Sequence, residues 1–137
     1  KRVVVIGGDL GACELATFLA ERGRKVTLLD SGERVAPEVG YKRRGEVKQS
    51  LEEAKVTVVS KVTYEEMTPT AVVYSLKGEK KTAEYDTVVI AGDVEPNLEL
   101  QKALEGKVPE LYAIGDCKGL GLIRRAIHDG AGVACKI

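Results

Sequence analysis

The stretch VVVIGGDLGACELA, residues 3–16, decides the fold of this chain. It begins within a β-branched apolar run from Arg2 to Ile6, a pattern typical of a parallel strand buried on both faces. Gly7-Gly8 end that run, and apolar positions then recur at helical spacing from Gly11 to Arg22. A second strand is expected over Lys25–Asp30, so residues 2–30 have the length and order of a βαβ unit.

The glycine turn carries a variant of the dinucleotide-binding fingerprint G-x-G-x-x-G/A, whose three fixed positions fall on Gly7, Asp9 and Ala12. In that fingerprint the first glycine makes the tight turn, the second admits the pyrophosphate and the third allows close helix–strand packing. The acidic residue expected about 20 residues later, as an acceptor for a ribose hydroxyl, is Asp30. No arginine follows it directly, which favours NADH over NADPH. The candidate cofactor-binding residues of this region are Gly7, Gly8, Asp9, Leu10, Gly11, Ala12 and Asp30.

Asp9 is the one departure within this fingerprint. A carboxylate about 4–5 Å from a phosphate charge is repelled by roughly 3–4 kcal/mol at an effective dielectric constant near 20. The N-terminus of a helix attracts a phosphate by about 1–2 kcal/mol. Two outcomes follow: the carboxylate repels the nucleotide, or Gly8 and Gly11 let the turn shift so that Asp9 caps the helix instead.

The rest of the chain predicts an α/β fold: a Rossmann-like parallel sheet flanked by helices, with an inserted antiparallel β-meander. Short strands separated by turn residues form the meander, and the final helix is weakened by two glycines. The expected elements are a helix over 43–54, a strand over 55–60, meander strands over 62–64, 70–76 and 82–85, a strand over 87–91 that rejoins the main sheet, another short strand over 111–114, and a helix over 123–136.

Composition excludes several classes of protein. Lys plus Arg and Asp plus Glu each number 21, so no excess charge favours nucleic acid or a membrane surface. The longest apolar run, Val3–Ile6, is too short to span a bilayer or to form a signal peptide, and we expect a cytoplasmic protein. The three cysteines have no C-x-x-C spacing, so we expect no metal site and treat them as buried apolar residues.

Four segments together resemble one known family: residues 1–30, DTVVIAGDVEPN at 86–97, VPELYAIGDC at 108–117 and AIHDG at 126–130. They are similar to the pyridine-nucleotide-disulfide-oxidoreductase-like part of the 2,4-dienoyl-CoA reductase and 2-enoate reductase family of NADH:flavin oxidoreductases. The resemblance implies that hydride passes from NADH to FAD. Electrons then travel through a 4Fe-4S cluster to FMN, which reduces an activated C=C bond.

This resemblance also implies a division of the chain. Residues 1–91 correspond to the NAD(H)-binding part, with Ala91 and Gly92 beside the nucleotide, and residues 92–137 to the return into the FAD domain, where Gly115 and Asp116 approach the flavin. FMN and the cluster belong to parts of the parent enzyme that this sequence does not contain. We expect one compact domain over residues 1–137 that is a fragment of a larger flavoenzyme. The sequence begins at Lys1 without a methionine, which favours a fragment, and we expect the fragment to be inactive alone. Its expected partners are the dinucleotide and the remaining domains of that enzyme.

Two aspartates depart from the family pattern, Asp9 in the fingerprint and Asp93 in the A-x-G-x-x-P-N-like segment. Three functions therefore stay open: an NADH-binding electron-input domain, a Rossmann scaffold whose nucleotide site Asp9 impairs, and an S-adenosylmethionine-binding domain. No catalytic residue is assigned, because His128 has no nucleophile or acid that can be placed beside it. Without the first half of the FAD domain, residues 111–137 are expected to pack on the sheet as an ordinary strand and helix.

Overall fold

The computed structural model describes residues 1–92 and 94–137, so the expectation for Asp93 lies outside the described residues. The chain divides into two compact units, Lys1–Gly92 and Asp93–Ile137, and each is described here by itself. None of the described helices is long and apolar enough to cross a membrane.

The first unit is built on a parallel four-stranded sheet with the strand order β3-β2-β1-β7. Its strands are β1 (Arg2–Ile6), β2 (Lys25–Asp30), β3 (Thr57–Ser60) and β7 (Thr87–Ile90). Strand β1 pairs with β2 on one side and with β7 on the other, so the fingerprint turn that follows it lies at the middle of the sheet. This confirms the Rossmann-like fold class.

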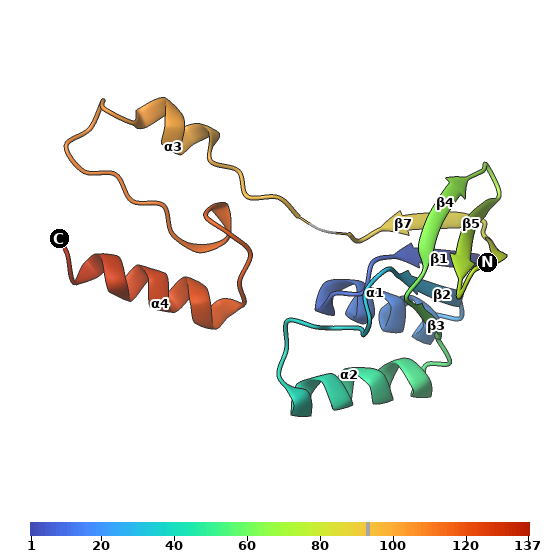
Figure 1. Cartoon of the computed structure of the whole chain (residues 1–137). Helices are drawn as coiled ribbons and strands as arrows, with labels where there is room; N and C mark the ends of the chain where they lie inside the picture. Colours follow the sequence, from blue (N-terminus) through green and yellow to red (C-terminus); the bar gives the residue numbers. More distant parts are fainter. Residues whose placement is uncertain (93) are drawn as a thin grey trace. The chain divides into compact units, whose positions relative to one another are not determined.

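Both faces of the sheet are covered, which explains the uninterrupted apolar sequence of β1. Val3 and Val5 point into a core beneath the helices α1 (Leu10–Glu21) and α2 (Tyr41–Glu53). Val4 and Leu29 point into a second core beneath the meander. Figure 1 labels α1 and α2 and, of the meander, the strands β4 and β5.

The expected meander is confirmed as an antiparallel three-stranded sheet inserted between β3 and β7. Its strands are β4 (Thr63–Met67), β5 (Ala71–Leu76) and β6 (Glu79–Glu84). Lys77 and Gly78 connect β5 to β6 with φ values of 54° and 84°, the left-handed pair that a two-residue hairpin turn requires. Val62, expected inside a strand, instead fills the core between the two sheets.

The second unit contains the helices α3 (Glu99–Leu104) and α4 (Ile123–Ala134) and a 3₁₀ turn, η1 (Gly115–Cys117). The expected strand at 111–114 is wrong, and with it the expectation that this segment packs as a strand on the sheet. A strand needs a neighbour to pair its N–H and C=O groups, and the described residues of this unit contain no strand. None of those residues is buried. The strand at 111–114 was predicted from its apolar pattern alone, and that pattern does not supply a core or a neighbouring strand.

The core beneath the helices generates a stability prediction. Leu28 is fully buried there, so Leu28→Ala leaves a cavity and should lower the free energy of unfolding of the first unit by about 2–5 kcal/mol. Chemical denaturation followed by circular dichroism measures the change. Val58→Ala, on β3 but partly exposed, is the control and should cost less than half as much; equal losses would contradict the assignment of this core.

Candidate functional site

The turn after β1 depends on Gly7. Its φ is +126°, a conformation that side chains rarely adopt, and an added Cβ would lie 2.6 Å from the carbonyl carbon of Ala91. The Gly7 N–H donates to the carbonyl of Leu29 at 2.9 Å, and the Ala91 N–H donates to Ile6 at 2.8 Å. The structure therefore brings Gly7 and Ala91, two of the predicted site residues, into direct contact at the carboxyl ends of β1 and β7.

Asp30 lies against the same turn, at the carboxyl end of β2. The residue is only 8% exposed, and a Cβ on Gly8 would lie 2.6 Å from its Oδ1 atom. Oδ1 accepts a hydrogen bond from Gly32 N at 3.0 Å, whereas the buried Oδ2 has no donor among the described residues. A buried acceptor without a donor is costly, so this atom fits a ligand hydroxyl.

Asp9 caps α1, which is one of the two outcomes that its position left open. Its backbone is extended, with φ −70° and ψ 176°, and its Oδ1 accepts from Ala12 N at 2.7 Å. Ala12 itself is fully buried against the sheet, as the close packing at the third fingerprint position requires. The carboxylate therefore occupies a helix N-terminus, where a phosphate is otherwise attracted.

A second carboxylate reaches the same helix end, and sequence reasoning missed it. Glu38 accepts a hydrogen bond from the backbone N–H of Leu10, the first residue of α1. The two residues are 28 positions apart, and no motif links them. Only the folded path of the loop between β2 and α2 brings them together.

That loop is held by buried apolar residues and by Arg44 of α2. The Arg44 guanidinium donates to the carbonyls of Ala36 at 3.1 Å, Pro37 at 3.2 Å and Val39 at 2.6 Å. Ala36 N donates to Gly8 O at 2.6 Å, and Ala36 has a φ of 47°. Such a conformation persists in a non-glycine residue only where its surroundings enforce it.

The meander contributes Tyr64 to this region. Its hydroxyl donates to Leu29 O at 2.7 Å, one residue before Asp30. Burial, followed by the nearby charge of Asp30, raises the pKa of Tyr64 to about 12. The hydroxyl therefore stays protonated at neutral pH and fixes β4 to the end of β2.

Two of the other predicted residues, Gly11 in α1 and Gly92 directly after Ala91, lie in the first unit. Gly115 and Asp116 lie in the second unit. Gly115 has a φ of +70°, and the exposed Asp116 accepts from Gly121 N at 3.2 Å through Oδ1. Asp116 thus acts as a turn residue. His128 is exposed on α4, with no ion pair described for it.

The prediction that all cysteines are buried is wrong for Cys117 and Cys135, which are exposed. Both belong to the second unit, whose described residues form no buried core, so small apolar side chains have nothing to pack beneath. Cys13 is buried in α1, and this burial raises the pKa of its thiol to about 12.

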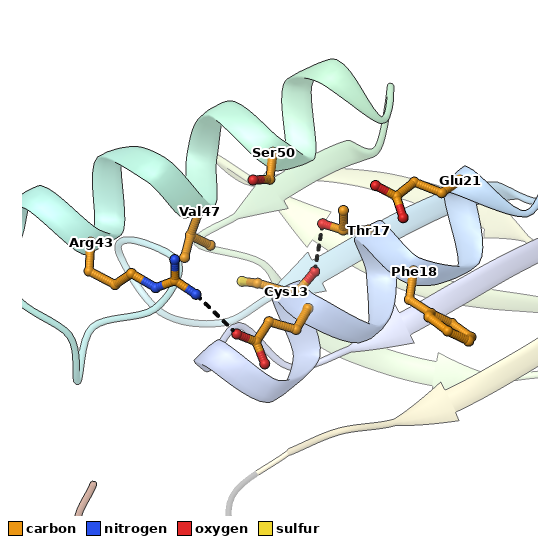
Figure 2. Close-up of a pocket in the computed structure, with 8 residues that line it drawn as sticks. Cys13, Thr17, Phe18, Glu21, Arg43, Val47 and Ser50 are labelled. Carbon is orange, nitrogen blue, oxygen red and sulfur yellow. Dashed lines mark hydrogen bonds and ion pairs between the residues drawn. The ribbon is translucent and has the colours of Figure 1, made fainter. Parts of the chain in front are cut away.

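A hollow of about 180 Å³ lies between α1 and α2, and Cys13 lines it (Figure 2). Arg43 crosses from α2 to pair with Glu14 of α1 at 3.3 Å, and Thr17 donates to the Cys13 carbonyl at 3.0 Å. None of the predicted site residues lines this hollow. The Arg43–Glu14 pair joins the two helices and the Thr17 bond lies within α1, so neither contact involves the fingerprint turn.

The sequence and the structure of this chain are both similar to those of known proteins. The family described as pyridine nucleotide-disulphide oxidoreductase matches residues 1–130. A bilirubin reductase from Mediterraneibacter gnavus is 33% identical over 94% of the chain, and an NADH oxidase from Thermoanaerobacter brockii is 32% identical over 100%. A solved 2-naphthoyl-CoA reductase in complex with 2-naphthoyl-CoA superposes on 99% of the chain with a TM-score of 0.90 and 32% identity.

The chain spans only about a fifth of the length of these three relatives: 20% of the bilirubin reductase, 21% of the NADH oxidase and 21% of the naphthoyl-CoA reductase. The similarity thus concerns one region of much longer oxidoreductases.

The contact between Gly8 and Asp30 predicts a coupled pair of substitutions. Gly8→Ala places a methyl group on the Asp30 carboxylate and should lower the free energy of unfolding by about 1–3 kcal/mol. In an Asp30→Ala background the same change should cost less than half as much, because the obstructing side chain is gone. A double-mutant cycle by chemical denaturation measures this coupling. Gly45→Ala, in an open position of α2, is the control for the glycine-to-alanine change and should raise the free energy of unfolding slightly. If the losses from Gly8→Ala and Asp30→Ala are additive, the contact between these two residues is contradicted.

The burial of Cys13 predicts how the thiols react. At pH 8 its raised pKa leaves almost no thiolate, which is the reactive form. A disulfide reagent added to the native protein should therefore modify the exposed Cys117 and Cys135 quickly, and Cys13 only after denaturant is added. Mass spectrometry of the modified peptides assigns the sites. Rapid modification of Cys13 in the native protein would show that α1 is not packed as described.

Proposed function

The chain belongs to the pyridine nucleotide-disulphide oxidoreductase family, as a dinucleotide-binding oxidoreductase domain, and we propose that residues 1–92 bind NADH. In the longer enzyme this unit would hold NADH so that hydride passes to FAD. By its resemblance to the 2-enoate reductase family, the enzyme would use that hydride to reduce an activated C=C bond, with FMN and a 4Fe-4S cluster in regions outside this chain.

The observation that carries the proposal is the buried Oδ2 atom of Asp30, which has no donor. A ribose hydroxyl of the adenosine half of NADH supplies the missing donor, and the glycine at position 8 leaves room for the Asp30 carboxylate beside the turn. A 2′-phosphate, as in NADPH, would instead place a negative charge against this carboxylate. The same atom therefore supports a preference for NADH.

The names of the relatives agree with a role in hydride delivery. One is an NADH oxidase, and two are reductases, of bilirubin and of 2-naphthoyl-CoA. A nicotinamide or flavin cofactor carries the hydride in hydride-transfer chemistry, while the protein contributes binding and orientation. In this chain Gly7 and Ala91 would leave the backbone open to the dinucleotide at the carboxyl edge of the sheet, and Asp30 would fix the ribose.

The pyrophosphate half of the site supports a second candidate, a scaffold with an impaired nucleotide site. Asp9 and Glu38 place their carboxylates on Ala12 N and Leu10 N, at the helix end where a pyrophosphate would bind. The ribose side of the site thus fits the cofactor, whereas the phosphate side opposes it. The net affinity decides between the two candidates.

Calorimetric titration separates them. Wild-type protein should bind NADH weakly and more tightly than NADPH, and Asp30→Ala should weaken NADH binding roughly tenfold or more, because a hydrogen bond to a carboxylate is lost. Asp9→Gly should strengthen NADH binding about tenfold by removing a like charge. Glu21→Ala, an exposed change at the far end of α1, is the control and should leave both affinities unchanged.

Two results would overturn the proposal. If neither the wild type nor Asp9→Gly binds NADH, the scaffold stands instead. If S-adenosylmethionine binds more tightly than NADH and is equally sensitive to Asp30→Ala, the ribose contact belongs to a different ligand.

A further inference from the structure

The most unexpected contact in the first unit is the one between Glu38 and the first residue of α1. We infer that Glu38 is an internal competitor of the dinucleotide pyrophosphate: its carboxylate holds the Leu10 N–H in the free protein and must leave when NADH binds. This inference rests on the proposed function and adds a residue that controls affinity. The dinucleotide fingerprint contains no position for it.

The first step of the argument is the occupancy of the helix end. The N–H groups of Leu10 and Ala12, one on each side of Gly11, both donate to carboxylates. A negative side chain at a helix N-terminus is favourable in the absence of a ligand. A pyrophosphate needs the same N–H groups and brings its own negative charge, so it competes with these carboxylates and is repelled by them.

The second step is the way in which Glu38 is held. Val35, Ala36 and Val39 are buried on either side of it, and Arg44 binds the carbonyls of this loop. The backbone of the loop is therefore fixed against the Gly8 turn, whereas the Glu38 side chain itself is exposed. Release then requires a rotation of one side chain into solvent, with no movement of the loop.

The third step separates Glu38 from Asp9. Asp9 caps from inside the turn and bonds Ala12, whereas Glu38 reaches over from the loop before α2 and bonds Leu10. Removing one carboxylate leaves the other in place. The observed affinity of a ligand falls in proportion to the fraction of molecules that are in the binding-competent state, so each carboxylate should lower the observed affinity on its own.

The variant that tests the inference is Glu38→Gln, which keeps the size of the side chain and removes its charge. It should bind NADH roughly five- to tenfold more tightly than the wild type, in line with the loss of one like charge near a helix end. Adenosine, which has the ribose but no phosphate, should bind both proteins equally. The gain for NADH should shrink between 50 and 500 mM KCl, because salt screens exposed charges.

Glu33→Gln is the matched control. Glu33 lies in the same loop and is also exposed, but its carboxylate pairs with Lys61 at 3.1 Å and not with α1. Its removal changes the net charge by the same amount and should leave NADH affinity within twofold of the wild type. Glu38→Asp adds a second comparison: it keeps the charge but is one methylene shorter, so from a fixed loop it should lose the Leu10 contact.

A readout without nucleotide keeps the inference separate from the proposed function. In ¹H–¹⁵N spectra of the free protein, the Leu10 amide should shift in Glu38→Gln and Glu38→Asp but not in Glu33→Gln. An unchanged Leu10 amide, or equal NADH affinities for Glu38→Gln and Glu33→Gln, would overturn the inference while NADH binding stands. If no variant binds NADH or adenosine, the proposed function fails, and the competition with it.

Discussion

The close approach of Gly7 to Ala91 is the constraint on which the rest of the first unit depends. A side chain at position 7 would overlap the Ala91 backbone, and the turn also needs a φ of +126°. Because this contact joins the ends of β1 and β7, it sets the start of α1 and places Gly8 against Asp30. Fold and candidate site are thus consequences of one glycine and its neighbour across the sheet.

Beyond that turn, the site combines one feature that attracts a dinucleotide with two that oppose it. The buried Asp30 carboxylate has an atom without a donor, while Asp9 and Glu38 saturate N–H groups at the start of α1. The opposing groups stabilise the free protein as helix caps. The contacts that favour folding therefore also lower the affinity for the cofactor. Asp9 and Glu38 make these contacts.

The local sequence pattern was sufficient to predict the parts of this structure in which a short segment determines its own secondary structure. The β-branched run of β1, the strand β2 and the turn at Gly7 lie where the sequence places them. The missing strand at 111–114 and the contact of Glu38 with Leu10 depend on partners that local sequence does not specify. Cys117 illustrates the same limit, since a small apolar residue is buried only where a core exists around it.

A structure determined from a crystal of this chain soaked with NADH tests most directly whether Asp30 binds the cofactor. The account predicts that a ribose hydroxyl of the adenosine half donates to Oδ2 of Asp30, and that Glu38 has turned away from Leu10 to admit the pyrophosphate. A nucleotide bound elsewhere, with Asp30 Oδ2 still lacking a donor, would contradict it.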